Sequence, residues 1–307
     1  MMSPGRQRNR LLLIDANSLI HRAFHALPPL TTPGGSPVQA IYGVASILIK
    51  VWKEGKPDYA AALFDRPEPT FRKQKYEPYK AHRPPAPPGL VEQIVEAHRL
   101  FPSLGIRVLE SPGSEADDLI ATLATRFAKE PDLQVEILSG DLDTLQLVRD
   151  DDVVVRVLKK GVSETELYNE DGVATRFGLK PSQLTDYKAL VGDPSDNVPG
   201  VPGIGPKTAR GFLQKFDSLE RLFENTEENP VLLKKLAPFR KEADLSKSLV
   251  VLDRNVPIPE LGLGDLRTHD LGEDFFAYCE RQGFGTLLRR AKADGSSPRL
   301  GKQQAIF

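Results

Sequence analysis

Short apolar runs in the first half of the chain each lead to a carboxylate. One run ends at Asp15, another ends at Asp65, and a third leads through Ser139 and Gly140 to Asp141. The strands of a parallel sheet point the same way, so the residues that follow them meet along one edge, where open α/β sheets bind ligands. The pattern therefore predicts a mostly parallel sheet whose carboxyl edge carries acids.

Helix-like and strand-like segments alternate as far as about residue 165. In the stretch 37–53, apolar residues recur at three- and four-residue spacing, as on one face of a helix. Ser114 is expected to cap a further helix, with Asp117 in the capping-box position. The βαβα order favours an α/β fold with a mostly parallel central sheet flanked by helices. Strands are expected at residues 11–15, 58–64, 106–109, 134–139 and 152–158, and further helices at 90–103 and from residue 114.

Further acids stand in three compact groups, at residues 115–118, 141–143 and 193–196. Each group has an ordinary interpretation, because acids complement the start of a helix and Asp, Ser and Pro form turns. Nine anions in one small space, however, need cations among them, and Mg²⁺ and Mn²⁺ prefer carboxylate ligands. The sequence therefore predicts bound divalent ions. The acids in question are Asp15, Asp65, Glu115, Asp117, Asp118, Asp141, Asp143, Asp193 and Asp196.

The overall charge conceals a basic surplus. The 307 residues include 41 Lys and Arg against 42 Asp and Glu, which gives a net charge of −1. Without the nine acids above, 41 basic residues face 33 acidic ones, a surplus of +8. This distribution suits a polyanionic partner better than the total charge does.

Composition also narrows the class of protein. Cys279 is the only cysteine, which excludes an internal disulfide and a thiolate zinc cluster. No apolar stretch approaches the roughly 20 residues that span a bilayer, and the first ten residues lack the apolar segment of a secretory signal. We therefore expect a cytoplasmic protein without a membrane partner.

Residues 66–89 differ from the rest of the first half. They are rich in proline, charge and aromatic rings and show no sustained apolar period. A solvated charge run is the usual interpretation of such a segment. Cations interleaved with tyrosines between residues 71 and 83 favour base stacking and phosphate contact with a single strand. A loop of this length inside a compact domain is usually functional or mobile.

The second half reads as a helical subdomain. After Gly192, a turn-forming stretch continues into a glycine-rich segment at 198–209 that has the form of a helix-hairpin-helix. Its glycines permit close backbone approach, and the amide groups that open the second helix can meet a phosphate. A nucleotide-binding glycine loop is the rival, but no strand precedes it and the Walker spacing is absent. Short helices are expected at 169–177, 182–191, 207–216, 218–224, 229–236 and 243–252.

Taken together, these motifs resemble the 5′ nuclease domains of bacterial DNA polymerase I, within the flap endonuclease family. The resemblance runs in order from about residue 10 to 290. It implies a PIN/5′-nuclease-like fold and a metal-dependent 5′-3′ exonuclease and flap endonuclease, with an arch over the site. The matching segments are residues 13–18, 22–27, 64–65, 71–72, 79–83, 115–118, 140–143 and 192–197.

The resemblance also implies roles for individual residues. Asp15, Asp65, Glu115, Asp117 and Asp118 match acids at the first metal, with Asp118 acting through water. Asp141 and Asp143 match ligands between the metals, and Asp193 and Asp196 match those of the second. Leu142 is a departure, because relatives often carry a basic residue there. Arg22, Arg72, Tyr79, Lys80 and Arg83 match phosphate-steering and arch residues, and Gly203, Gly205, Lys207 and Thr208 are expected to contact DNA.

The expected activity is two-metal hydrolysis of DNA phosphodiester bonds in primer removal and repair, with two or more Mg²⁺ or Mn²⁺ ions. K⁺ is a candidate at the helix-hairpin-helix. Expected partners are DNA with a 5′ flap, nick or 5′ end, an RNA primer, and a fused or separate DNA polymerase, with the protein as a monomer. A non-catalytic DNA-binding module and a PIN-type ribonuclease are the alternatives. The expected divisions are a disordered start at 1–9, a nuclease core at 10–165 with an arch at 66–89, a helical subdomain at 166–292 with the helix-hairpin-helix at 198–216, and a tail at 293–307.

Overall fold

The computed structural model describes residues 8–159, 161–225, 236–258 and 260–295. The expected disordered start lies outside these ranges as far as residue 7, and β1 already begins at Asn9. The expected tail lies outside them from residue 296, whereas helix α13 continues to Gly295. The helix expected at 229–236 lies outside them except for its last residue.

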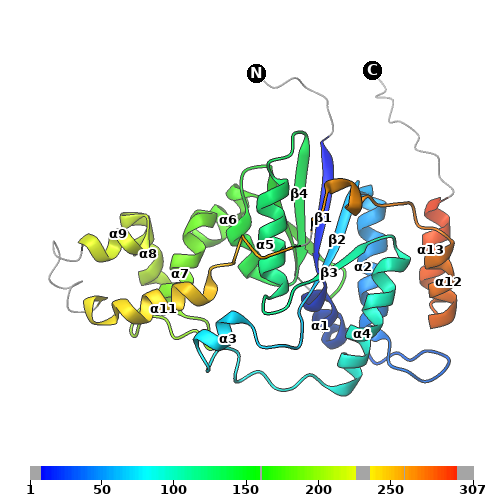
Figure 1. The fold of residues 1–307 in the computed structure, drawn as a ribbon, viewed down its shortest axis with the longest axis horizontal. Helices are drawn as coiled ribbons and strands as arrows, with labels where there is room; N and C mark the ends of the chain where they lie inside the picture. Colours follow the sequence, from blue (N-terminus) through cyan, green and yellow to red (C-terminus); the bar gives the residue numbers. More distant parts are fainter. Residues whose placement is uncertain (1–7, 160, 226–235, 259, 296–307) are drawn as a thin grey trace.

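The centre of the molecule is a six-stranded sheet with the order β3-β2-β1-β4-β5-β6 (Figure 1). The first five strands pair in parallel, and β6 runs antiparallel to β5. The expected mostly parallel sheet is confirmed, with one added edge strand. Its strands are β1 (Asn9–Asp15), β2 (Tyr59–Phe64), β3 (Arg107–Glu110), β4 (Leu133–Ser139), β5 (Val153–Leu158) and β6 (Thr165–Tyr168).

Both faces of the sheet are covered, which explains why its strands read as continuous apolar runs. Successive side chains of a strand point to opposite faces. In β1, Leu11 and Leu13 therefore pack in the cluster that contains α5 (Ala116–Phe127). Leu12 and Ile14 pack in the opposite cluster. That cluster is formed by α1 (Ala16–Ala26), α2 (Gln39–Gly55), α4 (Pro88–Ser103), α12 (Glu273–Gln282) and α13 (Gly285–Gly295).

A helical lobe follows the sheet and projects to one side of it (Figure 1). Its core joins the α5 side of the sheet, because Leu190, Leu213 and Leu222 belong to the same apolar cluster as β1 and β4. The lobe contains α6 (Glu170–Phe177), η2 (Pro181–Gln183), α7 (Leu184–Val191), α8 (Pro206–Phe216), α9 (Leu219–Glu224), η4 (Ala237–Phe239) and α11 (Arg240–Val250).

After α11 the chain returns to the sheet. The backbone of Thr268 donates to the carbonyl oxygen of Asp58 beside β2, just after the short helix η5 (Leu263–Leu266). Helices α12 and α13 then pack against α4 and α2, on the far side of the sheet from the lobe. Helix α12 and most of α13 fall inside the expected helical subdomain at 166–292, yet the two helices complete the core of the first half.

Two local expectations are corrected. The N-cap of α5 is Glu115 rather than Ser114, and the capping box is closed by Asp118, whose carboxylate accepts from the Glu115 backbone. The stretch 66–89 is also less irregular than expected, because it contains helix α3 (Phe71–Lys75). Within the part of the chain that the structure describes, no helix is both long and apolar enough to cross a membrane.

Candidate functional site

Asp15 leaves the sheet at the end of β1 and caps α1. Its carboxylate accepts hydrogen bonds from the Ser18 backbone at 3.0 Å and from the Ser139 hydroxyl at 2.6 Å. The side chain is only 4% exposed. Burial, together with the nearby carboxylates of Asp65 and Asp141, raises the pKa of Asp15 to about 7 against the lowering effect of these hydrogen bonds. The expected meeting of β1 and β4 acids at one edge is therefore seen directly.

Asp65 and Asp117 lie beside Asp15. Asp65 follows β2 and accepts from the Ala116 backbone at 2.7 Å, so it is held at the start of α5. Asp117 stands in the first turn of α5, and its Oδ1 atom is buried without a hydrogen-bond partner among the described residues. Burial raises the pKa of Asp117 well above its usual range, with further increases from Asp15 and Asp141. A buried, unpartnered carboxylate oxygen next to other carboxylates fits a cation site.

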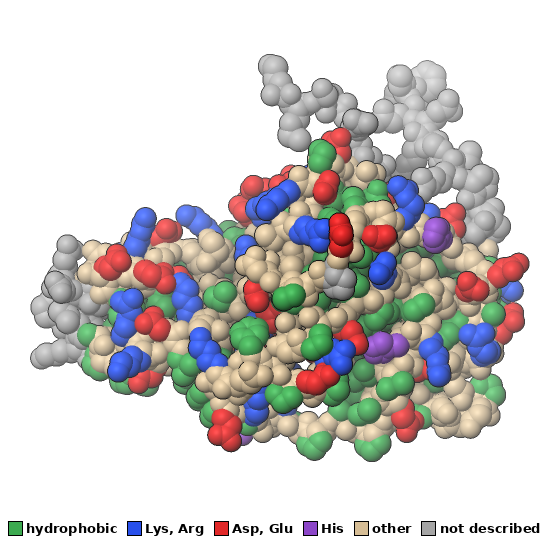
Figure 2. Space-filling model, viewed as in Figure 1, with side chains coloured by type: hydrophobic (Ala, Val, Ile, Leu, Met, Phe, Trp, Pro, Cys, Tyr) green, Lys and Arg blue, Asp and Glu red, His purple; other side chains and the backbone are tan. Residues whose placement is uncertain are grey.

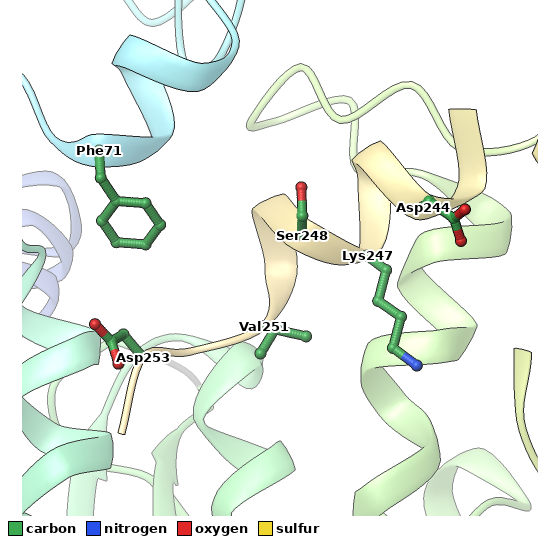
Figure 3. A pocket seen from close by; sticks show the side chains of 6 residues that line it. All are labelled: Phe71, Asp244, Lys247, Ser248, Val251 and Asp253. Atoms are coloured by element: carbon green, nitrogen blue, oxygen red, sulfur yellow. The ribbon is translucent and has the colours of Figure 1, made fainter. Parts of the chain in front are cut away.

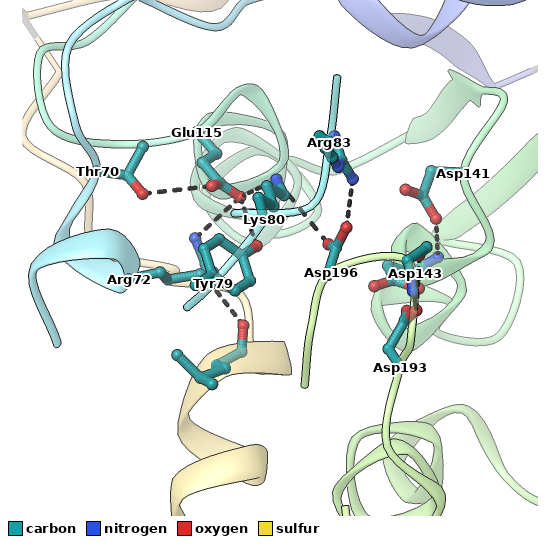
Figure 4. Close-up of polar contacts among 12 residues, drawn as sticks. Thr70, Arg72, Tyr79, Lys80, Arg83, Glu115, Asp141, Asp143, Asp193 and Asp196 are labelled. Carbon is teal, nitrogen blue, oxygen red and sulfur yellow. Dashed lines mark hydrogen bonds and ion pairs between the residues drawn. The ribbon is translucent and has the colours of Figure 1, made fainter. Parts of the chain in front are cut away.

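Asp141, Asp143 and Asp193 form the neighbouring part of the site (Figure 4). Asp141 follows β4 and caps the short helix η1 (Leu142–Leu147), accepting from the Asp143 backbone at 2.9 Å. Burial and the adjacent Asp141 raise the pKa of Asp143 to about 6. Although burial raises the pKa of Asp193, hydrogen bonds from Lys188 and Ser195 lower it to about 2.

Lys188, on α7, is a site residue that the sequence analysis missed. Its ammonium group donates to Asp193 at 2.7 Å and also binds Asp143. Burial lowers the pKa of Lys188, but these two carboxylates raise it more, so the lysine is held charged. The sequence gives no clear signal for it, because Asp193 lies beyond the end of α7 at Val191, and a spacing of five residues does not pair side chains on a helix.

The arch segment, residues 66–89, covers the acids from the other side. Lys80 lies 2.9 Å from Glu115 and 4.0 Å from Asp196, and Arg83 pairs with Asp196 (Figure 4). The backbone of Lys80 also donates to the Asp196 carbonyl oxygen at 3.0 Å. In this conformation, two arch cations expected to face DNA phosphates instead neutralise carboxylates.

Tyr79 is placed differently from a base-stacking residue. Its side chain is 4% exposed and packs with Val198, Leu249 and Val250. Its hydroxyl donates to Glu115 at 3.2 Å. The ring therefore anchors the arch segment, and the expectation of base stacking by Tyr79 is not supported in this conformation.

Asp118 does not line the cavity of the acids, and it holds Arg72, which lines that cavity and lies 3.4 Å from Glu115. Two guanidinium nitrogens of Arg72 each lie 2.6 Å from one oxygen of Asp118, and the side chains are 1% and 0% exposed. Asp118 also accepts from the backbones of Glu115 and Asp253. With its oxygens engaged in this way, the pair does not match the expected roles of Asp118 at a metal and Arg72 at a phosphate.

Arg22 lies at the edge of the acids. Its guanidinium donates to the Lys159 carbonyl oxygen at 3.1 Å. A Cβ atom added to Gly140 would lie 3.2 Å from Nε of Arg22 and 2.7 Å from the Ser18 hydroxyl. The glycine before Asp141 therefore allows α1 to approach the end of β4 closely, and Arg22 stands beside that junction.

Eight acids remain close to one another, and we call them the acid cluster: Asp15, Asp65, Glu115, Asp117, Asp141, Asp143, Asp193 and Asp196. Six of them line a common cavity of about 20 Å³ together with Tyr79 and Lys80. Such a volume holds about one water molecule. Within the described ranges, no three carboxylates, cysteines or histidines form a ready-made ion-binding group. Instead, Lys80, Arg83 and Lys188 each form an ion pair with a carboxylate of the acid cluster.

The expected helix-hairpin-helix is formed by α7, α8 and their connection. A Cβ atom on Gly200 would lie 2.4 Å from the Gly192 backbone nitrogen, so the connection requires glycine there. Gly205 is the N-cap of α8, and Lys207 and Thr208 are exposed in its first turn. Together with Gly203, these residues leave the start of α8 open to solvent, away from the cavity of the acid cluster.

Surface charge does not single out the site. On the face shown in Figure 2, basic and acidic side chains are interspersed over both the sheet and the helical lobe. A separate hollow of about 440 Å³ lies between α3 and α11, where Phe71 and Val251 are exposed (Figure 3). Its lysine, Lys247, is bound by Asp186 and Glu220. The hollow therefore offers no cation that is free of carboxylates.

Two family models match consecutive parts of the chain. The N-terminal resolvase-like domain of 5′-3′ exonucleases matches residues 10–178, and the C-terminal SAM fold of 5′-3′ exonucleases matches residues 179–273. The first model alone matches more than half of the chain. The two matches meet between α6 and η2, within the helical lobe.

Similar proteins include two bacterial polymerases. The chain is 39% identical to DNA polymerase I of Bacillus subtilis over 293 residues and 41% identical to the thermostable DNA polymerase I of Thermus thermophilus over 282 residues. These alignments cover 94% and 92% of this chain and 33% of each polymerase. The chain thus spans about a third of the length of these relatives.

Solved structures share the fold at low identity. The bacteriophage T5 5′-exonuclease with bound zinc has a TM-score of 0.61 at 20% identity, covering 93% of this chain and 98% of that protein. Human GEN1 in complex with Holliday junction DNA has a TM-score of 0.60 at 14% identity, covering 96% of this chain and 76% of that protein. Both likenesses extend over the sheet and the helical lobe together.

Proposed function

The chain belongs to the 5′-3′ exonuclease family, and on that premise we propose that it is a metal-dependent nuclease that cuts DNA at 5′ ends and 5′ flaps. The observation that carries the proposal is the acid cluster. Asp15, Asp117 and Asp141 come from three separate elements, yet Asp15 and Asp141 both raise the pKa of Asp117, and Asp141 also raises that of Asp15. So much mutual repulsion in a buried place is relieved by bound cations.

The acid cluster fits two or more Mg²⁺ or Mn²⁺ ions, which prefer oxygen ligands. Asp15, Asp65, Glu115 and Asp117 would hold one ion, Asp193 and Asp196 another, with Asp141 and Asp143 between them. The unpartnered Oδ1 of Asp117 is an oxygen that the fold leaves available for this purpose. Ions bound there supply a Lewis acid that activates water and stabilises charge on the phosphate.

Three side-chain cations of the chain would assist the reaction. Lys80 and Lys188 are both held charged, because the acids beside them raise their pKa against the effect of burial. Once divalent ions take over the carboxylates, Lys80, Arg83 and Lys188 can turn to the scissile phosphate and balance its developing charge. Arg22, at the edge of the cluster, is placed to steer an incoming phosphate.

The arch segment has to move for DNA to reach the acids. A cavity of about 20 Å³ excludes a phosphodiester, and Tyr79 and Lys80 of the arch segment line it, while Arg83 binds Asp196 at its edge. Their contacts are mostly polar, because Lys80 and Arg83 bind Glu115 and Asp196. Opening would therefore exchange these ion pairs for contacts with the phosphates of a single strand.

The downstream duplex would bind at the start of α8. Backbone amides at a helix start attract phosphate, and Lys207 and Thr208 add a charge and a hydroxyl there. Such contacts touch the sugar-phosphate backbone and carry no base information, so the structure of the DNA would select the cleavage position. A K⁺ ion between this hairpin and a phosphate is part of the same proposal.

Primer removal and repair are the processes that such an activity would serve. The polymerase relatives contain about twice as much additional sequence, so a fused or separate polymerase is the proposed partner. The RNA primer, the monomeric state and the location in the cytoplasm belong to the same proposal.

Product mapping on 5′-flap, nicked and RNA-primed duplexes, with and without Mg²⁺, tests the proposed function. A nuclease of this kind releases 5′-phosphorylated products only when the divalent ion is present. Binding without cleavage at every divalent concentration would favour a non-catalytic DNA-binding module. Cleavage of single-stranded RNA without preference for a junction would favour a PIN-type ribonuclease.

A further inference from the structure

A second cavity adjoins the acid cluster on the side of α7. It has a volume of about 350 Å³, which is within the range of small-molecule sites. Asp141, Asp143 and Val250 line both this cavity and the small one under the arch segment, so the two meet at the carboxylates. We call the larger one the side pocket.

The lining of the side pocket combines a charged group with an apolar group of residues, which we call its charged end and its apolar end. Asp141, Asp143 and Lys188 form the charged end. The apolar end consists of Leu142 at the start of η1, Phe177 at the end of α6, and Leu184 and Tyr187 of α7.

The two aromatic rings give the apolar end a defined shape. The centroids of Phe177 and Tyr187 lie 6.5 Å apart, with their planes inclined by 67°. Leu142, Phe177 and Tyr187 are only partly buried, although they pack against the main core. A ligand in the side pocket would therefore remove further apolar surface from water, as a stacked nucleobase does.

We propose that the side pocket binds the base of a 5′-phosphorylated nucleotide whose phosphate lies at Asp141, Asp143 and Lys188. This inference rests on the proposed function and adds a subsite to it. At the charged end, Lys188 and the divalent ions that the carboxylates would hold both attract a phosphate. A flat ring attached to that phosphate through a sugar meets Leu142 and Tyr187 at the other end.

In this arrangement Leu142 and Tyr187 contact the flat face of the base and form no hydrogen bond to its edge. Gln146 and Thr185 are the other polar side chains of the side pocket, and the amide group of Gln146 is already engaged. Its amide nitrogen donates to the carbonyl oxygens of Asp143 and Val250, and its amide oxygen accepts from the Leu252 backbone. The side pocket should therefore bind all four bases with similar affinity, as stacking sites do.

The test compares two ligands in Mg²⁺, 2′-deoxyadenosine 5′-monophosphate and 2-deoxyribose 5-phosphate, which lacks the base. Ligand-detected NMR gives both dissociation constants on the intact chain. We expect the nucleotide to bind about tenfold more tightly than the sugar phosphate, the gain of one stacked base. The Tyr187→Ala variant should reduce this ratio to roughly twofold or less while leaving the affinity for the sugar phosphate unchanged.

Leu142→Lys provides a second variant, with Leu167→Lys as its control. Leu167 is an exposed apolar residue on β6, so a lysine there tests the added charge alone. The ratio should collapse in Leu142→Lys and persist in Leu167→Lys. A wild-type ratio near one, or a ratio unchanged in both Tyr187→Ala and Leu142→Lys, would overturn the inference.

The same design separates this inference from the proposed function. If the wild-type protein cleaves flaps but binds both ligands equally well, the proposed base-binding role of the side pocket is wrong and the proposed nuclease function stands. If the nucleotide binds more tightly than the sugar phosphate but no flap is cleaved, the side pocket binds a base and the proposed nuclease function is wrong. A duplex with an abasic 5′-terminal nucleotide distinguishes the source of the base, because it binds more weakly only if the side pocket accepts the end of a DNA strand.

Discussion

Arg72 and Asp118 form a buried, bidentate ion pair, with both nitrogen-oxygen distances at 2.6 Å. Arg72 also donates to the carbonyl oxygens of Leu249 and Val251, so it joins the arch segment to α5 and to the end of α11. Each nitrogen of the Arg72 guanidinium group and each carboxylate oxygen of Asp118 therefore has a hydrogen-bond partner. The pair therefore fixes one foot of the arch segment beside the acid cluster.

Asp118→Asn should destabilise the protein strongly, because the buried Arg72 guanidinium loses its main counter-charge and keeps only the longer contact of 3.4 Å with Glu115. Removing one partner of a buried pair typically costs about 3–5 kcal/mol. Urea unfolding followed by circular dichroism measures this loss. Glu68→Gln is the matched control, because Glu68 pairs with Arg66 at the surface, and its loss should be near zero. A change below about 1 kcal/mol in Asp118→Asn would contradict the assigned role.

Without divalent ions, stability should fall as the pH rises from about 4 to 7. Burial raises the pKa of Asp15 to about 7 and that of Asp143 to about 6. In this window the folded protein holds protons that the unfolded chain has released, so unfolding is favoured as the pH rises. His21 opposes the trend near the upper end, because burial lowers its pKa. Thermal unfolding in EDTA between these pH values measures the slope.

Adding Mg²⁺ should reverse that loss and raise the melting temperature more at pH 8 than at pH 5. The ion binds carboxylates only after they lose their protons, and ligands that bind the folded state alone stabilise it by mass action. The same thermal unfolding experiment with and without Mg²⁺ measures the difference. Equal shifts at both pH values would argue that the ion binds elsewhere.

Lys207→Glu should weaken duplex binding and flatten its dependence on salt, because one phosphate contact is replaced by repulsion. The slope of log affinity against log salt should fall in magnitude by about one. Fluorescence anisotropy of a labelled duplex across a salt series measures both quantities. Lys129→Glu, an exposed lysine just beyond α5, is the control. If Lys207→Glu and the wild type have the same affinity and the same salt slope, the duplex does not bind at the start of α8.

The sequence predicted those features that follow from one local element, such as the end of a strand or a glycine turn. Asp15, Asp65 and Asp141 follow strands whose apolar runs are unmistakable, and parallel pairing brings strand ends together whatever the loops do. The glycine-rich segment before α8 could be predicted for a similar reason. The approach of Gly200 to Gly192 permits few residues other than glycine.

The partners of the charged residues could not be predicted in this way. Arg72 and Asp118 are 46 positions apart, and either could have faced DNA or metal equally well. Lys188 looks like an ordinary surface lysine of α7 until the fold places Asp143 against it. Periodicity also cannot tell which apolar surface a helix covers, so the packing of α12 and α13 on the first half was missed.

The most direct measurement is flap cleavage by Asp141→Asn, with Asp171→Asn as the matched control. Asp141 contributes to both cavities of the site, whereas Asp171 is exposed in the first turn of α6. In Mg²⁺, Asp141→Asn should cleave a labelled 5′-flap substrate at least about 100-fold more slowly than the wild type, the scale of losing one group that stabilises the transition state. Flap binding should remain nearly unchanged, and Asp171→Asn should behave as the wild type. Wild-type cleavage by Asp141→Asn would contradict the assignment of the acid cluster as the catalytic site.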